Sequence, residues 1–458
     1  MATIIGALSA TDSVFDGGTL ALDGANGVHT VNIGGRIFVY VTGYDDSGVN
    51  AFELRASGEL RFAQTLRDVG ARALAGAEKI SSVTLGSGSY VYVTASDDSG
   101  ITVFRHAANG SLTFVEAVFD DATLELSGTF GQTAVARVGN ANFLIASGSS
   151  DNGISVFRIN ANGTLTNTSN FDNASNGSVA LNGAADIATV TYDGQTFVFV
   201  AGAGENGISA FRLDATGSLI FTDSVFDNGT LELDEPQGMA AYVVGGQPYV
   251  FAAGRSDDGI SVFQLTSSGM LINVFNISDT AALGLDGVNS LSLVEVEGRT
   301  LLVATGNGDD ALGIFSVGSD GSLAHVSTTF DTSSIALNGA NSSAVATIGD
   351  TTFIVASGFD DDGFSVFGFG AGPDTLEGTA GADRILGLGD NDILNGNGGN
   401  DVLIGGAGAD QLNGGAGYDQ ASYEGSTAGV VVDIESGISL FGHAAGDTFI
   451  GIENLKGS

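Results

Sequence analysis

Apolar and polar residues alternate at strand spacing along most of the chain, and no stretch keeps a helical period of useful length. In the first repeating unit, four short stretches (27–33, 36–43, 48–54 and 59–66) are separated by Gly-Gly, Asp-Ser-Gly and Ser-Gly turns. The first two stretches are rich in β-branched and aromatic residues, which is typical of strands buried on both faces. The pattern therefore predicts a unit of four strands joined by turns.

This unit recurs seven times, marked each time by an acidic turn that leads into G-[IV]-x-[VA]-F or a close variant. Seven copies of a unit of roughly fifty residues predict a seven-bladed β-propeller. The marker glycines are Gly48, Gly100, Gly153, Gly207, Gly259, Gly313 and Gly363.

The start of the chain is expected to complete the last blade. Residues 7–16 resemble the fourth strand of other units, at 111–120 and 218–227, whereas the seventh unit stops after 365–369 without a fourth strand of its own. Such closure leaves no open sheet edge. We therefore predict a propeller over residues 1–369, closed by the N-terminal strand.

A second repeat of nine residues follows, G-G-x-G-x-D-x-U-x, where U is a large apolar residue; its cleanest copy spans 405–413. This register predicts a parallel β-roll over 370–422, with a C-terminal β extension over 423–458 whose continuation past Ser458 the sequence leaves open. The segment resembles the RTX (hemolysin-type) family of secreted calcium-binding proteins. The repeated aspartates are Asp374, Asp383, Asp392, Asp401, Asp410 and Asp419.

Calcium is the cofactor that this repeat predicts. Glycines let main-chain carbonyls turn inward, and Ca²⁺ takes six to eight oxygen ligands from carbonyls and carboxylates. We expect the six aspartates, together with Asn391 and Asn400, to be the side-chain ligands, and the roll to fold only as it loads calcium. Two copies depart from the pattern, with Asp390 at a glycine position and the small Ala421 at the apolar position.

The propeller resembles the seven-bladed lactonase-like family through its YVTN-type strands, FVYVTG at 38–43 and YVYVT at 90–94. That resemblance implies the fold. A secreted hydrolase of lactonase type is the activity it would imply, but no residue of a lactonase active site can be aligned onto this chain.

Composition and charge limit the partners. The chain has no Cys and a formal net charge of −39 at pH 7, which argues against nucleic acid and anionic lipid. No apolar run reaches the length of a membrane span, and no signal-peptide pattern follows Met1. The RTX resemblance implies export through a type I secretion machinery with an uncleaved C-terminal signal, and hence a secreted or cell-surface location.

The acidic turns allow two interpretations. Propeller topology places their carboxylates in a ring on the face where ligands usually bind, so they form either a cation site or an acidic platform. Alternatively they only make the turns; this second interpretation is favoured, because the same chemistry is needed seven times. The ring consists of Asp46, Asp98, Asp151, Glu205, Asp257, Asp310 and Asp361.

Catalytic constellations are scarce. The four histidines, His29, His106, His325 and His443, fall at unrelated positions of the repeat, and only His29 is on a strand predicted to line the central channel. Arg255 stands where the other units have small residues, which makes it either a surface charge or an anion ligand.

These observations favour an extracellular binding or assembly module, such as an adhesin, surface-layer or matrix component, over an enzyme. Its expected partners are calcium ions and an extracellular glycan or protein. The alternatives are the secreted lactonase-type hydrolase and, less favoured, a calcium store, which would need no propeller.

Overall fold

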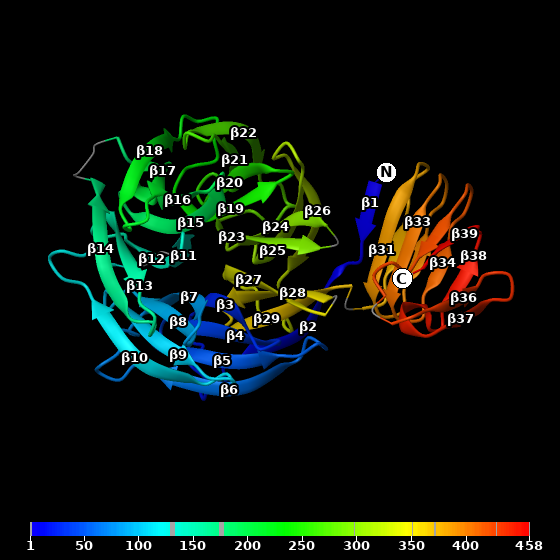
Figure 1. The fold of residues 1–458 in the computed structure, drawn as a ribbon, viewed down its shortest axis with the longest axis horizontal. Helices are drawn as coiled ribbons and strands as arrows, with labels where there is room; N and C mark the ends of the chain where they lie inside the picture. Colours follow the sequence, from blue (N-terminus) through cyan, green and yellow to red (C-terminus); the bar gives the residue numbers. More distant parts are fainter. Residues whose placement is uncertain are drawn as a thin grey trace.

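A computed structural model describes residues 2–128, 133–173, 178–296, 298–349, 351–370, 372–426 and 428–457. Nearly every regular element in it is a β-strand. Seven four-stranded sheets form a ring, and a separate β-roll lies beside the ring (Figure 1). The chain is therefore a seven-bladed β-propeller followed by a parallel β-roll, as the repeats predict.

Each of the first six blades is one antiparallel sheet whose strands follow chain order. Blade 1 comprises β3 (Ala25–Ile33), β4 (Arg36–Gly43), β5 (Gly48–Leu54) and β6 (Leu60–Arg67). Blade 2 comprises β7 (Ala77–Leu85), β8 (Gly88–Ala95), β9 (Gly100–His106) and β10 (Leu112–Phe119). Blade 3 comprises β11 (Thr133–Val138), β12 (Ala141–Gly148), β13 (Gly153–Ile159) and β14 (Leu165–Asp172).

Blade 4 comprises β15 (Ala184–Tyr192), β16 (Gln195–Gly202), β17 (Gly207–Leu213) and β18 (Leu219–Phe226). Blade 5 comprises β19 (Pro236–Val244), β20 (Gln247–Gly254), β21 (Gly259–Leu265) and β22 (Leu271–Ser278). Blade 6 comprises β23 (Val288–Val296), β24 (Arg299–Gly306), β25 (Ala311–Val317) and β26 (Leu323–Phe330).

Blade 7 contains β27 (Ala340–Ile348), β28 (Thr351–Gly358) and β29 (Gly363–Phe369). Its outer strand is the N-terminal β2 (Leu8–Phe15), which pairs antiparallel with β29 in the register Leu8↔Phe369 to Phe15↔Gly363. The ring is thus closed by pairing between the two ends of the propeller sequence.

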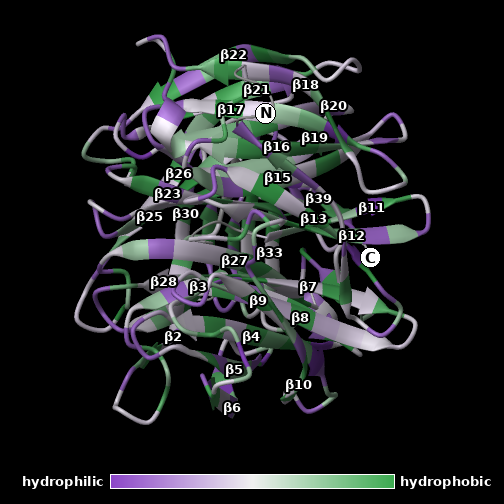
Figure 2. Ribbon diagram, turned by 90° about the vertical axis from the view of Figure 1, so that its left-hand side faces the viewer, coloured by the Kyte–Doolittle hydropathy of each residue, from purple (hydrophilic) through white to green (hydrophobic). Residues whose placement is uncertain are grey.

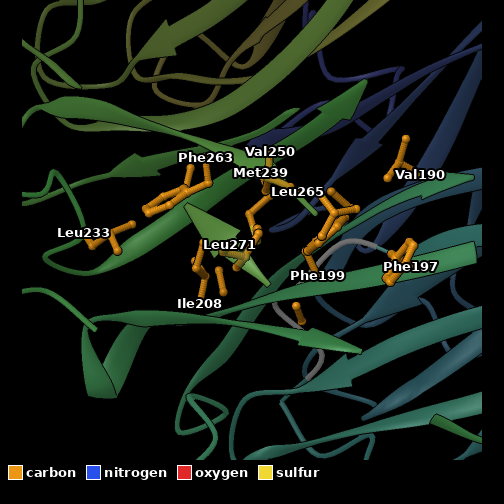
Figure 3. Close-up of a cluster of buried hydrophobic side chains, with 14 of the residues drawn as sticks. Val190, Phe197, Phe199, Ile208, Leu233, Met239, Val250, Phe263, Leu265 and Leu271 are labelled. Carbon is orange, nitrogen blue, oxygen red and sulfur yellow. The ribbon is translucent and has the colours of Figure 1, made fainter. Parts of the chain in front are cut away.

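The hydrophobic core lies between neighbouring blades. One cluster joins blades 4 and 5, where the side chains of Phe199 and Phe263 are fully buried (Figure 3). Hydrophobic residues follow the strands, and hydrophilic ones lie mainly in the loops (Figure 2). Burying one such side chain stabilises the fold by about 1.5–3 kcal/mol, and this accounts for the β-branched and aromatic inner strands.

The acidic turns hold the ring together. The last residue of each turn has a positive φ of 48° to 58°, a conformation in which Asn and Asp are enriched. Its side-chain oxygen accepts the backbone N–H of a residue in the loop leading into the next blade, and Asp362 Oδ1 closes the ring by accepting from Gly24 N at 2.9 Å. These residues are Ser47, Ser99, Asn152, Asn206, Asp258, Asp310 and Asp362.

The carboxylates of the predicted acidic ring hold loops in place. Each accepts one or two backbone N–H groups from the preceding loop, as Asp98 Oδ2 does from Leu74 and Ala75, both at 2.9 Å. In blade 6 this position belongs to Asp309 and not to Asp310, because the turn there is one residue offset from the sequence alignment. The ring members are Asp46, Asp98, Asp151, Glu205, Asp257, Asp309 and Asp361.

The β-roll consists of two parallel sheets whose neighbouring repeats pair eighteen residues apart, for example Leu394↔Leu412. Its apolar core includes Ile385, Leu394, Leu403 and Leu412, all fully buried. One sheet has the order β1 (Ala2–Ile5), β31 (Asp383–Gly389), β33 (Val402–Ala407), β35 (Gln420–Ser422), β39 (Asn454–Lys456), and the other β30 (Thr375–Glu377), β32 (Ile393–Asn395), β34 (Gln411–Asn413), β38 (Thr448–Ile450).

The first strand of the chain, β1, belongs to the roll and not to the propeller, which the sequence did not indicate. It pairs parallel with β31, so that Ile4 lies opposite Ile385 at the apolar position of the repeat. Figure 1 shows β1 beside β31, with the chain running from there into β2. The N-terminal segment therefore spans both units.

Residues 423–457 extend the roll. A short antiparallel hairpin of β36 (Val431–Asp433) and β37 (Ile438–Leu440) intervenes, after which β38 and β39 pair with β34 and β35. In the described part of the chain, no helix has the length and apolar character that crossing a membrane requires.

Candidate functional site

Carboxylates of the roll form two ladders, one on each side. In each rung, Oδ1 of an aspartate accepts the backbone N–H of the aspartate eighteen residues earlier. Thus Asp392 accepts from Asp374 at 2.8 Å, Asp401 from Asp383 at 2.8 Å and Asp410 from Asp392 at 2.9 Å. The sequence-predicted aspartates are therefore brought together in register.

The second oxygen of four ladder carboxylates is buried and has no hydrogen-bond partner among the described residues: Oδ2 of Asp392, Asp401, Asp410 and Asp419. Each lies over the first glycine of its own repeat. A Cβ built on Gly405 would lie 2.0 Å from Asp410 Oδ2, and one on Gly387 would lie 2.2 Å from Asp392 Oδ2. A buried carboxylate oxygen without a partner is costly, so these positions fit a cation.

Burial raises the pKa of Asp392 to about 7, with a further contribution from the neighbouring Asp410 and Asp374 carboxylates. Burial likewise raises the pKa of Asp410 to about 7, assisted by Asp447. A bound divalent cation would reverse this effect, because an opposite charge favours the ionised form.

The predicted asparagines use their side-chain oxygens in the loops. Asn391 Oδ1 accepts the backbone N–H of Ala409 at 2.7 Å, and Asn400 Oδ1 that of Tyr418 at 3.1 Å. Asp383 also differs from the other ladder members, because the hydroxyl of Thr379 donates to its Oδ2 at 2.9 Å. The assignment of all these residues as calcium ligands stays a prediction.

Two acidic residues of the ladders were missed from the sequence. Asp447 Oδ1 accepts the N–H of Asp410 at 2.9 Å, and Glu453 Oε2 that of Asp419 at 2.8 Å. The signal was present, since residues 447–450 read D-x-U-x like the repeats, but the hairpin insertion breaks the nine-residue spacing. Asp447 is buried and also accepts the hydroxyl of Tyr423 at 2.8 Å.

Within the described ranges, no three His, Asp or Glu side chains converge closely enough to hold a metal by themselves. Calcium held by the roll would therefore need main-chain carbonyls beside the ladder carboxylates, and the glycines bring such carbonyls close. A Cβ on Gly396 would lie 2.5 Å from Gly414 O and 2.4 Å from Asp401 Oδ2. This donor set of hard oxygens suits Ca²⁺.

A second candidate site lies at the mouth of the propeller channel, where the second strands end and the first strands begin. It is a cavity of about 560 Å³, within the range of small-molecule sites. Its polar lining includes Asn26, Glu78, Lys79, Arg255, Asn289 and Asn341.

Side-chain amides form a directed hydrogen-bond chain across this mouth. Asn289 Nδ2 donates to Asn341 Oδ1 at 2.8 Å, and Asn341 Nδ2 donates to Asn26 Oδ1 at 2.9 Å. Asn26 Nδ2 then donates to Glu78 Oε2 at 2.6 Å, while Ser96 Oγ donates to Glu78 Oε1 at 3.2 Å. The chain fixes the orientation of each amide and ends on a buried carboxylate.

The charges at the base of the mouth perturb one another. Burial raises the pKa of Glu78 and of Asp186 to about 7 each, and Lys79 opposes both shifts. Burial lowers the pKa of Lys79, opposed by the same two carboxylates. Perturbed titratable groups in a cavity are typical of functional sites.

Glu78→Gln is expected to reduce the pH dependence of stability. Because the pKa of Glu78 is higher in the folded chain than in the unfolded chain, proton binding to Glu78 stabilises the fold. This contribution is complete below pH 4.5 and is lost as the pH rises through about 7, which lowers the free energy of unfolding by about 3 kcal/mol. The free energy of unfolding in urea, measured from pH 5 to 8, should fall less steeply in the variant. Glu59→Gln, at an exposed carboxylate, is the control; parallel pH profiles for wild type and Glu78→Gln would contradict the assignment.

Two histidines of the propeller lie in packed surroundings. His29 is on a channel-lining strand, as expected, but its Nε2 is hydrogen-bonded to Ser82 Oγ at 2.8 Å, and burial lowers its pKa to about 4. His106 is buried against Phe38 and Tyr40, with ring centroids 5.0 and 5.6 Å away. Neither lines the cavity at the mouth.

Comparison with known proteins agrees with both halves of the fold. Residues 370–403 and 386–421 match the RTX calcium-binding nonapeptide repeat, and no curated protein matches the chain. A putative 6-phosphogluconolactonase from Bacteroides uniformis is similar in structure, with a TM-score of 0.50 and 15% identity over 67% of this chain and 88% of that one. The structure of BBS1N in complex with ARL6DN also gives 0.50, with 13% identity over 80% and 96%.

The periplasmic gluconolactonase of Pseudomonas aeruginosa gives a TM-score of 0.48, with 12% identity over 66% of this chain and 85% of that one. At these identities the likeness concerns the fold alone. Residues 370–421 are thus RTX calcium-binding repeats, and they follow a seven-bladed β-propeller of the fold found in lactonase-like proteins.

Proposed function

We propose that the protein is exported and acts outside the cell as a binding or assembly module, with the propeller mouth as its ligand site. The observation that carries this proposal is the cavity of about 560 Å³ with its ordered amide chain. Side-chain amides held in one orientation provide specificity for polar ligands without any chemical step. An extracellular glycan or protein is the partner class that this surface suits.

The roll supports the extracellular setting. RTX repeats bind calcium, and the ladder carboxylates with unpartnered buried oxygens are the groups proposed to hold it, together with nearby carbonyls. Calcium is abundant outside cells and scarce in the cytosol, so a roll that folds on loading calcium would fold after export. Type I export, without a cleaved N-terminal signal, is the proposed route.

A lactone hydrolase remains the second candidate, favoured by one observation. Glu78 is buried at the mouth with a pKa of about 7, a value suited to a general base at neutral pH. Lys79 lies beside it in the lining and could polarise a carbonyl. On this alternative, Glu78→Gln would abolish turnover.

Glycan-array binding of the calcium-loaded full chain, with a lactone-hydrolysis panel beside it, tests the two candidates. Ala203→Trp would fill the mouth and is expected to abolish glycan binding, whereas Ala56→Trp, in an exposed turn outside it, should bind like wild type. Binding that survives Ala203→Trp would contradict the mouth as ligand site. Lactone turnover that disappears in Glu78→Gln would replace the binding role by the enzymatic one.

A further inference from the structure

We propose that the channel mouth binds a carboxylate-bearing sugar of the uronate class, with Arg255 as the residue that selects the carboxylate. This inference rests on the proposed function, since it names the ligand class of the same cavity. It follows from the one guanidinium, one aromatic pair and one amide chain that line the mouth.

Arg255 follows β20 at the cavity rim. The other blades place Tyr44, Ser96, Ser149, Ala203, Asn307 and Phe359 there, so the expectation of small residues is wrong for blades 1 and 7. The Arg255 side chain is exposed and makes no hydrogen bond or ion pair within the described parts of the chain. Other arginines in the described part of the propeller contact carboxylates or carbonyls nearby, as Arg36 does with Glu53 at 2.6 Å. In a chain of net charge −39, an arginine left without a carboxylate at a cavity rim suits an anionic ligand.

The aromatic part of the rim suits a sugar ring. Tyr44 and Phe359, from the adjoining blades 1 and 7, have ring centroids 6.3 Å apart and a tilt of 50°. The Tyr44 hydroxyl donates to Asp97 Oδ1 at 3.4 Å, which helps to hold the ring in place. Both rings line the cavity and offer an apolar surface to the C–H face of a pyranose.

Sugar hydroxyls both donate and accept, and the floor offers both functions. The amide chain from Asn289 through Asn341 to Asn26 presents oriented N–H and C=O groups. These groups would be satisfied by a polyhydroxylated ligand.

Charge balance distinguishes a uronate from other anions. Glu78 and Lys79 line the mouth, and the buried Asp186 interacts with Lys79. With pKa values of about 7, the two acids together carry about one negative charge at neutral pH, which balances Lys79 and leaves Arg255 as the one unbalanced cation of the described lining. A phosphate monoester carries nearly two charges at pH 7 and exceeds this single positive charge. A neutral sugar would leave Arg255 without a partner, whereas one carboxylate at the rim matches one guanidinium.

Titration calorimetry of the calcium-loaded full chain with digalacturonate, and with the neutral galactose disaccharide as comparison, tests the inference. Wild type should bind the uronide, and Arg255→Gln should weaken that binding by roughly ten- to a hundredfold. Arg61→Gln, at an exposed arginine of the outer strand β6, is the matched control and should bind the uronide like wild type. It also tests for binding through calcium bridges to the acidic surface, because such binding would change equally in the two arginine variants. Thermal melting checks that Arg255→Gln stays folded.

Three results would overturn the inference. They are no binding of the uronide, binding of the neutral disaccharide at equal strength, or the same loss in Arg61→Gln as in Arg255→Gln. If other glycans still bind in a manner blocked by Ala203→Trp, only the uronate assignment fails. If no glycan binds at all, the proposed binding function fails with it.

Discussion

Removing calcium from the full chain should unfold the roll and leave the propeller folded. The roll has only a small apolar core, and its ladder carboxylates repel one another when no cation lies between them. Each tenfold rise in free calcium above the dissociation constant should stabilise the roll by about 1.4 kcal/mol per bound ion. Differential scanning calorimetry across a calcium series should show one transition that moves with calcium and one that does not.

Asp410→Asn tests the ladder as the source of this effect. Removing one buried carboxylate should weaken calcium affinity at its site by on the order of tenfold or more and lower the calcium-dependent transition. Asp390→Asn carries the same charge change at an exposed loop position and should have little effect. Equal effects of the two variants would mean that overall charge, and not the ladder, binds calcium.

Gly6→Val is expected to destabilise the roll through its junction with the propeller. Gly6 directly follows β1 and continues its register, in which Ile5 lies opposite Leu386, so that Gly6 lies beside Gly387 of β31; its N–H donates to Leu386 O at 2.8 Å. An added Cβ would lie 2.5 Å from Gly387 O and 2.9 Å from Asp374 Oδ2. The neighbouring Ala7 N–H, which donates to Asp374 Oδ2 at 2.9 Å, would be displaced as well.

The calcium-dependent melting transition should therefore fall in Gly6→Val by several degrees, corresponding to a loss of roughly 1–3 kcal/mol. Gly17→Val is the control, because a Cβ there meets nothing within 4 Å. If both variants melt like wild type, β1 does not stabilise the roll. Loss of the propeller transition alone would place the effect in β2 and blade 7.

The sequence determined the two repeats, and with them the fold class. Strand alternation and the recurring acidic turns specify blades, because each of the seven turns needs a residue that tolerates positive φ, and this residue is followed by Gly in every blade but the sixth, where Ala311 follows Asp310. The nonapeptide fixed the phase of the ladder aspartates, since parallel pairing at eighteen residues follows from a nine-residue period.

Features that depend on contacts between residues far apart in the sequence were decided only by the tertiary structure. Nothing local in residues 2–5 distinguishes a propeller strand from a roll strand; β1 joins β31 because an exposed parallel edge is available there. Asp447 and Glu453 join the ladders because the hairpin at 431–440 stands outside the register of the roll, so that β38 and β39 pair with β34 and β35. The cavity at the mouth exists because seven blade ends, far apart in sequence, meet around one axis, and that convergence is invisible in any single repeat.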